Sequence, residues 1–297
     1  MPISETQLET WSKQGAVKQS ADTYATIRIA LQDSTAPYSG KDYEIFLQGS
    51  YGNDTNIYAD SDVDVIMKLN STYYYDTSNL PADQLELFNN ASSKADYSWS
   101  DFKKDVFSHL DKKFPVKVTA GNKAIYIKAD GARRETDVVA CAQFRRFFNF
   151  QSWTNCSYTE GIAFWTSGNI KIINYPKLHS ENCTKKHQQT GQWFKPTVRI
   201  LKNMRNSMIS NGFLAEGIAP SYFLEGMLYN VPNSLFGGSY ADTFVKAINW
   251  MKNCPDRSKL LCANEQYYLL HPESPVTWRV EKLQTFLEAT TSFWASR

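Results

Sequence analysis

The sequence predicts an α+β fold with two lobes, the first built around a sheet and the second mainly helical. Short apolar runs typical of strands are concentrated between residues 43 and 141, one helical stripe precedes them, and helical spacing dominates after about residue 160. The expected lobes are therefore residues 1–160 and 161–297. A chain of 297 residues with 42% apolar side chains buries a core of ordinary size and suits one bilobal domain or two small ones.

The first lobe is expected to begin with a long amphipathic helix. Its buried stripe recurs at helical offsets and consists of Val17, Ala21, Tyr24, Ile27 and Leu31. Apolar runs at 43–48 and 62–69 predict two strands of one buried sheet, joined by a polar loop. Two further runs, 124–128 and 135–141, flank an Asp130-Gly131 pair, which is a hairpin signal.

Residues 70–100 are rich in polar residues and tyrosine and are expected to form a surface insertion before a helix at 101–114. Pro196 is typical of the first turn of a helix, which would bury Val198, Leu201 and Met208. Further helices are expected at 240–252 and 276–294. The core positions of the last one are expected to be Val280, Leu283, Leu287 and Trp294.

Composition limits the classes of function. A net charge of +2 argues against strong sequence-independent binding of duplex nucleic acid, which needs many Lys and Arg contacts to phosphates. The five cysteines are odd in number, widely spread and without a Cys-x-x-Cys pair, so we expect reduced thiols. No leader or long apolar segment is apparent, and we expect a cytoplasmic protein that does not bind a membrane.

A pair of aspartates carries the main chemical signal. Gly49-Ser50 ends one expected strand and is followed, after eleven residues, by Asp62-Val63-Asp64 at the start of the next. Because side chains alternate along a strand, Asp62 and Asp64 project from one face. Two neighbouring carboxylates repel each other unless a cation is present, and Mg²⁺ binds one or two carboxylates together with substrate phosphates. The spacing predicts a site for two Mg²⁺ ions, which Mn²⁺ could replace.

A third carboxylate would complete a two-metal site, and Asp137 is the candidate. It lies on an expected strand between Thr136 and Val138, so its side chain would converge with the Asp pair if the two strands are neighbours. Gly49 removes a Cβ where the backbone would approach a phosphate, and Ser50 adds a hydroxyl to the donors of that turn.

This combination resembles the polymerase-β-like nucleotidyltransferase superfamily, whose signature is Gly-Ser or Gly-Gly, a spacer, Asp-x-Asp and a later third Asp. Within it, LQGSYGNDTNIYADSDVDVIMKL is similar to the cyclic GMP-AMP synthase and DncV-like enzymes of bacterial anti-phage systems, the CD-NTases. The resemblance implies a palm with a mixed sheet, a long N-terminal spine helix, a helical second lobe and an active site in the cleft between the lobes.

The resemblance extends into the second lobe. The segment PTVRILKNMR (196–205) is similar to the family segment with a triphosphate-binding lysine, and this role falls to Lys202. The segment APSYFL (219–224) is similar to one in which a serine contacts phosphate and the next aromatic residue stacks on the donor base, which implies these roles for Ser221 and Tyr222. Arg199 lies one helical turn before Lys202 and is left outside the predicted site.

A zinc site is not expected. The DNA-sensing animal enzyme carries a His/Cys zinc-binding thumb, which this sequence lacks, so we expect no stable binding of duplex DNA. His179, Cys183 and His187 recur every four residues, but their polar neighbours favour a solvated helix surface. With four histidines in all, nucleophilic catalysis by imidazole is not indicated either.

The implied activity is synthesis of a cyclic di- or trinucleotide second messenger from nucleoside triphosphates, with ATP, GTP or both as the expected substrates. The product would be read by a separate effector protein in anti-phage signalling, and a regulatory protein partner is compatible with the sequence. Two alternatives remain open at this point. A linear RNA or tRNA-end nucleotidyltransferase shares the palm but needs a more basic groove, and a catalytically silent nucleotide-binding module would be expected to lack one of the aspartates.

Overall fold

The computed structural model describes residues 3–15, 17–58 and 62–296. By packing, the chain divides into two compact units, each described by itself. The sheet unit comprises residues 18–47 and 62–176, and the helical unit comprises residues 1–17, 48–61 and 177–297. The expected lobes, 1–160 and 161–297, divide the chain at another place, and as functional lobes they stay a prediction.

A mixed sheet forms the centre of the sheet unit, with the order β1-β2-β5-β4-β3, and β6 and β7 continue from β5. The β2–β5 pair is parallel and all other pairs are antiparallel. The strands in chain order are β1 (Tyr43–Leu47), β2 (Val63–Asp76), β3 (Val118–Ala120), β4 (Ile125–Ile127), β5 (Thr136–Ser152), β6 (Asn155–Trp165) and β7 (Lys171–Asn174). The predicted strands and the 124–141 hairpin are confirmed, and Gly131 supplies the positive φ (57°) of the hairpin turn.

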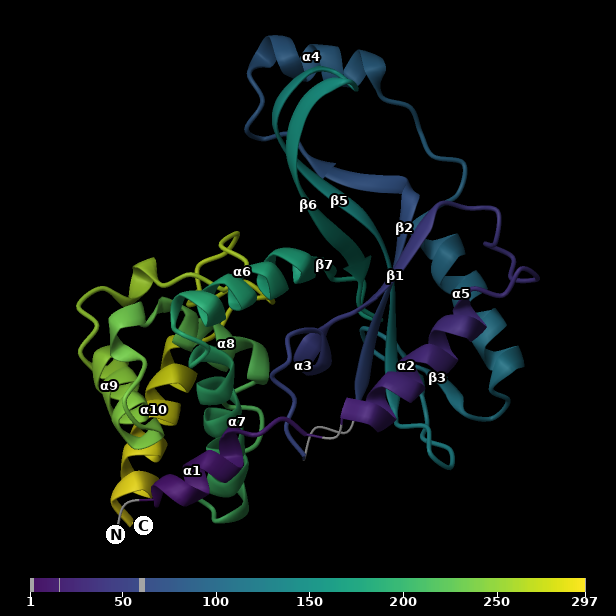
Figure 1. Ribbon diagram of the computed structural model, residues 1–297. Coiled ribbons are helices and arrows are strands. Elements are labelled where there is room, and N and C mark those ends of the chain that lie inside the picture. The colour runs from purple at the N-terminus through teal and green to yellow at the C-terminus, as the bar shows by residue number, and fades with distance from the viewer. Residues whose placement is uncertain (1–2, 16, 59–61, 297) are drawn as a thin grey trace. The chain divides into compact units, whose positions relative to one another are not determined.

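Two helices, α2 (Val17–Leu31) and α5 (Trp99–Lys113), lie beside the sheet (Figure 1). They meet where the His109 Nε2 lies 2.9 Å from the carbonyl oxygen of Ala30. Helix α5 begins at a capping box in which Ser98 and Asp101 satisfy each other's backbone N–H groups. The extents of both helices agree with the sequence-based expectation, but the predicted buried stripe of α2 is wrong in part: Ile27 and Leu31 are buried, whereas Val17 and Ala21 are exposed and Ser20 and Thr23 are buried in their place.

The distal half of the sheet departs from the expectation of a surface insertion at 70–100. Strand β2 runs on to Asp76, and α4 (Ala82–Ala91) follows at the far end of the β5–β6 ribbon (Figure 1). A bulge interrupts the β2–β5 pairing, because Leu69 pairs with Ala142 whereas Tyr73 pairs with Gln143. Beyond it, an apolar cluster is formed by Leu80, Phe88, Phe147 and Phe150. Tyrosines and scattered polar residues hid this small second core in the sequence.

The helical unit consists of helices around one apolar core. Its helices are α1 (Glu5–Ser12), α3 (Gly49–Gly52), α6 (Pro176–Gln189), α7 (Phe194–Ser210), α8 (Ser221–Asn230), α9 (Tyr240–Lys252) and α10 (Val280–Ser296), with 3-10 turns η1 (Asn233–Leu235) and η2 (Arg257–Lys259). Val198, Leu201 and Met208 of α7 are buried in this core, as predicted.

Two expectations for the second half of the chain are wrong in detail. The strand pattern does not fade at residue 160, since β6 continues to Trp165 and β7 follows. Val280 is 52% exposed because it is the first residue of α10, whereas Leu283 and Leu287 are buried as predicted.

No helix in the described ranges is long and apolar enough to span a membrane.

Candidate functional site

The sheet unit places acidic side chains in a row across neighbouring strands. Asp64 on β2 lies directly opposite Asp137 on β5 in the parallel pairing, and Asp137 lies opposite Tyr126 on β4. Asp62, exposed, immediately precedes β2. The predicted convergence of the Asp pair with Asp137 therefore occurs, because β2 and β5 are neighbours.

The electrostatics of this row fit a cation. Burial, together with the negative charges of Asp62 and Glu135, raises the pKa of Asp137 above its ordinary value. A half-buried carboxylate surrounded by like charges is stabilised when a divalent ion is bound, and oxygen ligands of this kind suit Mg²⁺. The donor set is thus of the right chemistry for the predicted metal.

Glu135 and Tyr126 were missed by the sequence analysis. Glu135 immediately precedes β5, two residues before Asp137, and its backbone carbonyl accepts a hydrogen bond from the Val63 N–H (2.9 Å). Its carboxylate accepts a hydrogen bond from the Tyr126 hydroxyl, which raises the pKa of Tyr126 to about 12 along with burial and the charges of Asp62 and Asp137. The Glu-x-Asp spacing was the available signal. The name acidic row is used below for Asp62, Asp64, Glu135 and Asp137.

The helical unit contains the Gly-Ser turn. Gly49 has φ of 64°, a conformation that a side chain would strain, so glycine is required by the backbone here. The turn opens the short helix α3, and the loop is closed by the Thr55 N–H, which donates to the carbonyl oxygen of Ser50 (2.9 Å).

A buried carboxylate anchors the loop that follows the turn. Glu225 of α8 is 3% exposed and accepts hydrogen bonds from the side chains of Asn53 (3.0 Å) and Thr55. It also accepts from His179 Nε2 of α6 (2.6 Å). Burial would lower the pKa of His179, but the adjacent Cys183 and Glu225 raise it to about 10, so the pair is a buried imidazolium and carboxylate. His179 and Glu225 are called the buried ion pair below.

His179 and Cys183 correct one expectation, since both are buried in the helical unit and do not lie on a solvated helix surface. Among the described residues, His179, Cys183 and Glu225 form a group of metal-binding residue types whose ligand atoms all lie within 4.8 Å of one another. However, the His179 nitrogen and the Glu225 oxygen are joined by a direct hydrogen bond, and Glu225 has two further donors. His179 Nε2 and both Glu225 oxygens are therefore already engaged in hydrogen bonds, which favours a structural polar cluster over a zinc site.

Lys202 lies below the same loop and does not reach the surface. Its side chain is 0% exposed, and its ammonium donates to the carbonyl oxygen of Thr55 (2.9 Å). Its positive charge also helps to lower the pKa of Glu225, after the larger effect of His179. The predicted contact with triphosphate stays a prediction, and in this structure the ammonium contacts the loop backbone.

Ser221 is the first residue of α8, and its hydroxyl accepts a hydrogen bond from Arg205 Nη1 (3.0 Å). The same nitrogen donates to the carbonyl oxygen of Ala219 (3.0 Å). Arg205 was not assigned a role from the sequence, although it follows Lys202 by three residues on α7 and therefore shares its helix face.

Tyr222 has one ring face covered. It stacks on His179 with ring centroids 4.8 Å apart and an interplanar angle of 23°, and its hydroxyl accepts a hydrogen bond from Asn264 (3.0 Å). Stacking on a base stays a prediction for Tyr222, and the ring face that lies on His179 is not available for it.

A mixed sheet with paired aspartates on two parallel strands and a preceding Gly-Ser turn defines a polymerase-β-like nucleotidyltransferase. Residues 181–295 match the cGAS/DncV-like nucleotidyltransferase C-terminal helical domain. The chain is 43% identical over 296 residues to the cyclic UMP-AMP synthase of Rhodothermus marinus, covering 99% of this chain and 98% of that protein. The chain belongs to the cGAS/DncV-like nucleotidyltransferases and is a cyclic dinucleotide synthase of the CdnE type.

Solved structures agree with this assignment. The R. marinus CdnE c-UMP-AMP synthase with Apcpp and Upnpp superposes with a TM-score of 0.88 at 42% identity, covering 99% of this chain and 97% of the other. The Elizabethkingia meningoseptica CdnE cyclic dinucleotide synthase with GTP and Apcpp gives 0.77 at 30%, covering 99% and 98%. The α+β fold predicted from the sequence, with a mixed sheet, a long helix near the N-terminus and a helical C-terminal part, is confirmed.

Proposed function

We propose that this chain joins one adenosine and one uridine nucleotide into cyclic UMP-AMP. The observation that carries the proposal is the 43% identity to the R. marinus cyclic UMP-AMP synthase across nearly the whole of both chains. Identity is lower to the cyclic dipurine synthase of E. meningoseptica (33%) and to the cyclic dipyrimidine synthase of Legionella pneumophila (31%). ATP and UTP are thus the proposed substrates, whereas the sequence led us to expect ATP, GTP or both.

In the proposed mechanism, a ribose hydroxyl of the acceptor attacks the α-phosphorus of the donor. The new P–O bond forms as the bond to the β-phosphate bridge oxygen breaks, and pyrophosphate leaves. Asp62, Asp64 and Asp137 are the residues that would hold two Mg²⁺ or Mn²⁺ ions, which neutralise charge on the phosphates when bound. Asp137, whose pKa is raised by burial and by the neighbouring carboxylates, would accept the hydroxyl proton.

The helical unit would bind the donor nucleotide. Gly49 permits a backbone turn without a Cβ, Ser50 offers a hydroxyl, and Ser221 lies at the start of α8 beside Arg205. We assign these groups to the triphosphate and the remaining face of Tyr222 to the base. Lys202 would act by holding the loop through Thr55 and by adding positive charge to it. A second transfer on the linear intermediate closes the ring.

The test is product analysis with pairs of nucleotides. Purified protein with Mg²⁺ is given α-labelled ATP together with UTP, CTP or GTP, and in parallel each triphosphate alone. We expect a primer-independent product from ATP and UTP whose label resists alkaline phosphatase, since a ring has no terminal phosphate, and whose mass equals AMP plus UMP less two waters.

Other outcomes separate the alternatives. A phosphatase-resistant product from another pair of nucleotides would show that the proposed bases are wrong, while the cyclic dinucleotide synthase activity would stand. A primer-dependent ladder with phosphatase-sensitive ends would support a linear nucleotidyltransferase and contradict the proposed cyclisation. We also propose that the product signals through a separate effector in phage defence, and an effect on plaque formation that survives Asp64→Asn would contradict this.

A further inference from the structure

A second pocket lies on the sheet unit, at the other end of the strands that carry the acidic row. Its cavity has a volume of about 750 Å³, within the usual range for small-molecule sites. It is lined by the distal half of β2, the end of α4 with the following loop, and β5, β6 and their connection. Asp137 and Arg145 are eight positions apart along β5, which corresponds to roughly 25 Å at the rise of a strand.

Arg145 is the central cation of this pocket. Its guanidinium lies over the Tyr73 ring at 4.1 Å and the Tyr158 ring at 4.9 Å from the centroids. Its Nε donates to Gln143 Oε1 (2.9 Å), which fixes the plane of the group. Within the described part of the chain, the Nη groups of Arg145 have no hydrogen-bond acceptor and no carboxylate partner. A guanidinium held by rings with its Nη donors unused is prepared for an anion such as a phosphate.

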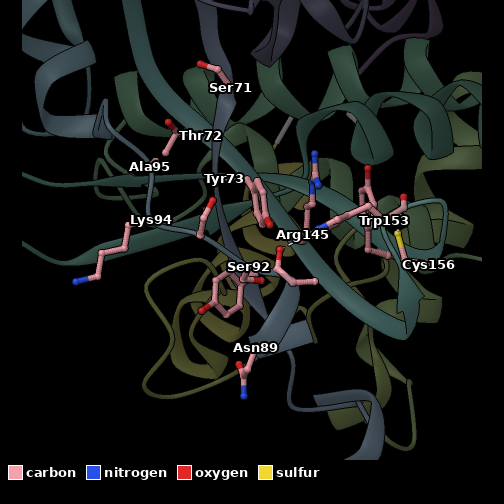
Figure 2. Close-up of a pocket in the computed structure, with 14 residues that line it drawn as sticks. Ser71, Thr72, Tyr73, Asn89, Ser92, Lys94, Ala95, Arg145, Trp153 and Cys156 are labelled. Carbon is pink, nitrogen blue, oxygen red and sulfur yellow. Dashed lines mark hydrogen bonds between the residues drawn. The ribbon is translucent and has the colours of Figure 1, made fainter. Parts of the chain in front are cut away.

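The surroundings favour an anion that also carries a flat ring. Trp153 and Tyr75 line the pocket and are 41% and 47% exposed, and exposed aromatic faces stack on nucleobases. None of the described residues that line the cavity is Asp or Glu, and Lys94 lies at its periphery (Figure 2). Figure 2 also shows Tyr73 beside Arg145, with Trp153 and Cys156 close together on one side.

We propose that this pocket binds a nucleotide, with its phosphate on Arg145 and its base on the exposed aromatic rings. A free mononucleotide and a cyclic dinucleotide share this chemistry. The β2 bulge at residues 70–72 supports the proposal, because it places Ser71 and Thr72 at the pocket and resets the strand before Tyr73. The site is separate from the acidic row and does not depend on catalysis.

The experiment is isothermal titration of the full chain with AMP, UMP, cyclic UMP-AMP and inorganic phosphate, each in EDTA. These probes lack a triphosphate, and without divalent ions the proposed catalytic site binds nucleotides weakly. We expect at least one nucleotide to bind at least about tenfold more tightly than phosphate, because the base adds stacking. Whichever of the mononucleotides and the cyclic dinucleotide binds more tightly is the kind of nucleotide that the pocket takes.

Variants locate the binding. Arg145→Gln should weaken it about 10- to 100-fold, the loss typical of a charge-assisted bidentate contact. The affinity of Arg145→Lys should lie between those of the parent and Arg145→Gln, since lysine keeps the positive charge but lacks the two parallel donors of the guanidinium. The matched control is Arg28→Gln, which removes an exposed arginine of α2 in the same unit and should leave binding unchanged. Lys94→Glu, at an exposed position where folding is not at risk, should weaken binding a few-fold.

Several results would overturn the proposal. These are equal affinities for the parent and Arg145→Gln, no nucleotide binding up to about 1 mM, or binding of oligoribonucleotides without any binding of mononucleotides or the ring. Pyrophosphate release from ATP and UTP is measured on the same preparations, so that a failure of the pocket proposal can be distinguished from a failure of the proposed function. Loss of turnover in Asp64→Asn with unchanged AMP binding would support a nucleotide-binding pocket that is separate from the catalytic site.

Discussion

The two sets of carboxylates in this protein have opposite environments. The acidic row lies on strands of the sheet unit with like charges around it, and this raises the pKa of Asp137. Glu225 in the helical unit is more deeply buried, yet its pKa is lowered, because His179, Thr55 and Lys202 outweigh the effect of burial. Burial alone therefore does not mark a reactive carboxylate. The row in which neighbouring carboxylates raise a pKa is suited to a cation, and the carboxylate that accepts several hydrogen bonds holds a loop in place.

The strongest test of this contrast is to neutralise the acidic row. Asp62→Asn or Asp64→Asn should lower turnover roughly 100- to 1,000-fold, because each removes a carboxylate that would hold a metal ion in the proposed site. The free energy of unfolding without metal should stay the same or rise, since like-charge repulsion is relieved. Pyrophosphate release and urea unfolding measure the two effects.

The matched control is Asp111→Asn, which changes an exposed aspartate on α5 of the same unit. It should change neither quantity. Near-parental turnover in Asp62→Asn or Asp64→Asn would mean that the metal site is misassigned.

Removal of a carboxylate from the buried ion pair should have the opposite effect on stability. Glu225→Gln should lower the free energy of unfolding by about 3 kcal/mol, because it leaves a buried imidazolium without its counter-ion. Denaturation in urea gives the value, with Glu216→Gln as an exposed control. If Glu225→Gln unfolded at the same urea concentration as the control, the pair would not be the anchor of the loop.

Tyr222 tests whether the buried ion pair also serves binding, since His179 covers one face of its ring. Tyr222→Ala should weaken binding of a non-hydrolysable donor analogue by about 1–3 kcal/mol through lost stacking. Tyr222→Phe keeps the ring and should bind nearly as the parent does, while losing about 1 kcal/mol of stability with the Asn264 hydrogen bond. Equal donor affinity in the alanine variant and the parent would make Tyr222 a core residue only.

The smallest expected effect is on pH dependence. The pKa of His179 is raised from 6.5 to about 10, so its stabilising contribution is complete below pH 6.5 and is lost as the pH rises toward 10. Lys186 acts in the opposite direction, because burial lowers its pKa to about 8. The informative quantity is therefore the difference in unfolding free energy between the parent and His179→Gln. It should shrink between pH 7 and pH 10, and a constant difference would show that His179 is not charged in the fold.

Local patterns predicted the parts of the site that depend on alternation and strand order. The Asp-x-Asp spacing placed Asp62 and Asp64 on one face, and the later Asp137 is opposite Asp64 once β2 and β5 pair. The buried ion pair could not be predicted in this way. His179 and Glu225 are 46 residues apart, and their hydrogen bond depends on how α6 packs on α8. Polar flanking residues on α6 suggested solvent because sequence periodicity does not report which face a neighbouring helix covers.

The distal sheet was missed for a related reason. Leu80 and Phe88 form a second small core with Phe147 and Phe150, which lie more than fifty positions away in the sequence, and the Tyr75 ring contacts Phe88. The same distance in sequence hid the pocket around Arg145.

The bulge between Leu69 and Tyr73 has a consequence for how such proteins diversify. A one-residue insertion in an uninterrupted strand would turn every later side chain to the opposite face. Here three residues already loop out of the pairing, so additions or losses at 70–72 can be absorbed there while Asp64 keeps its position opposite Asp137. The distal end of the sheet is free to change in length and in lining across generations without disturbing the carboxylates.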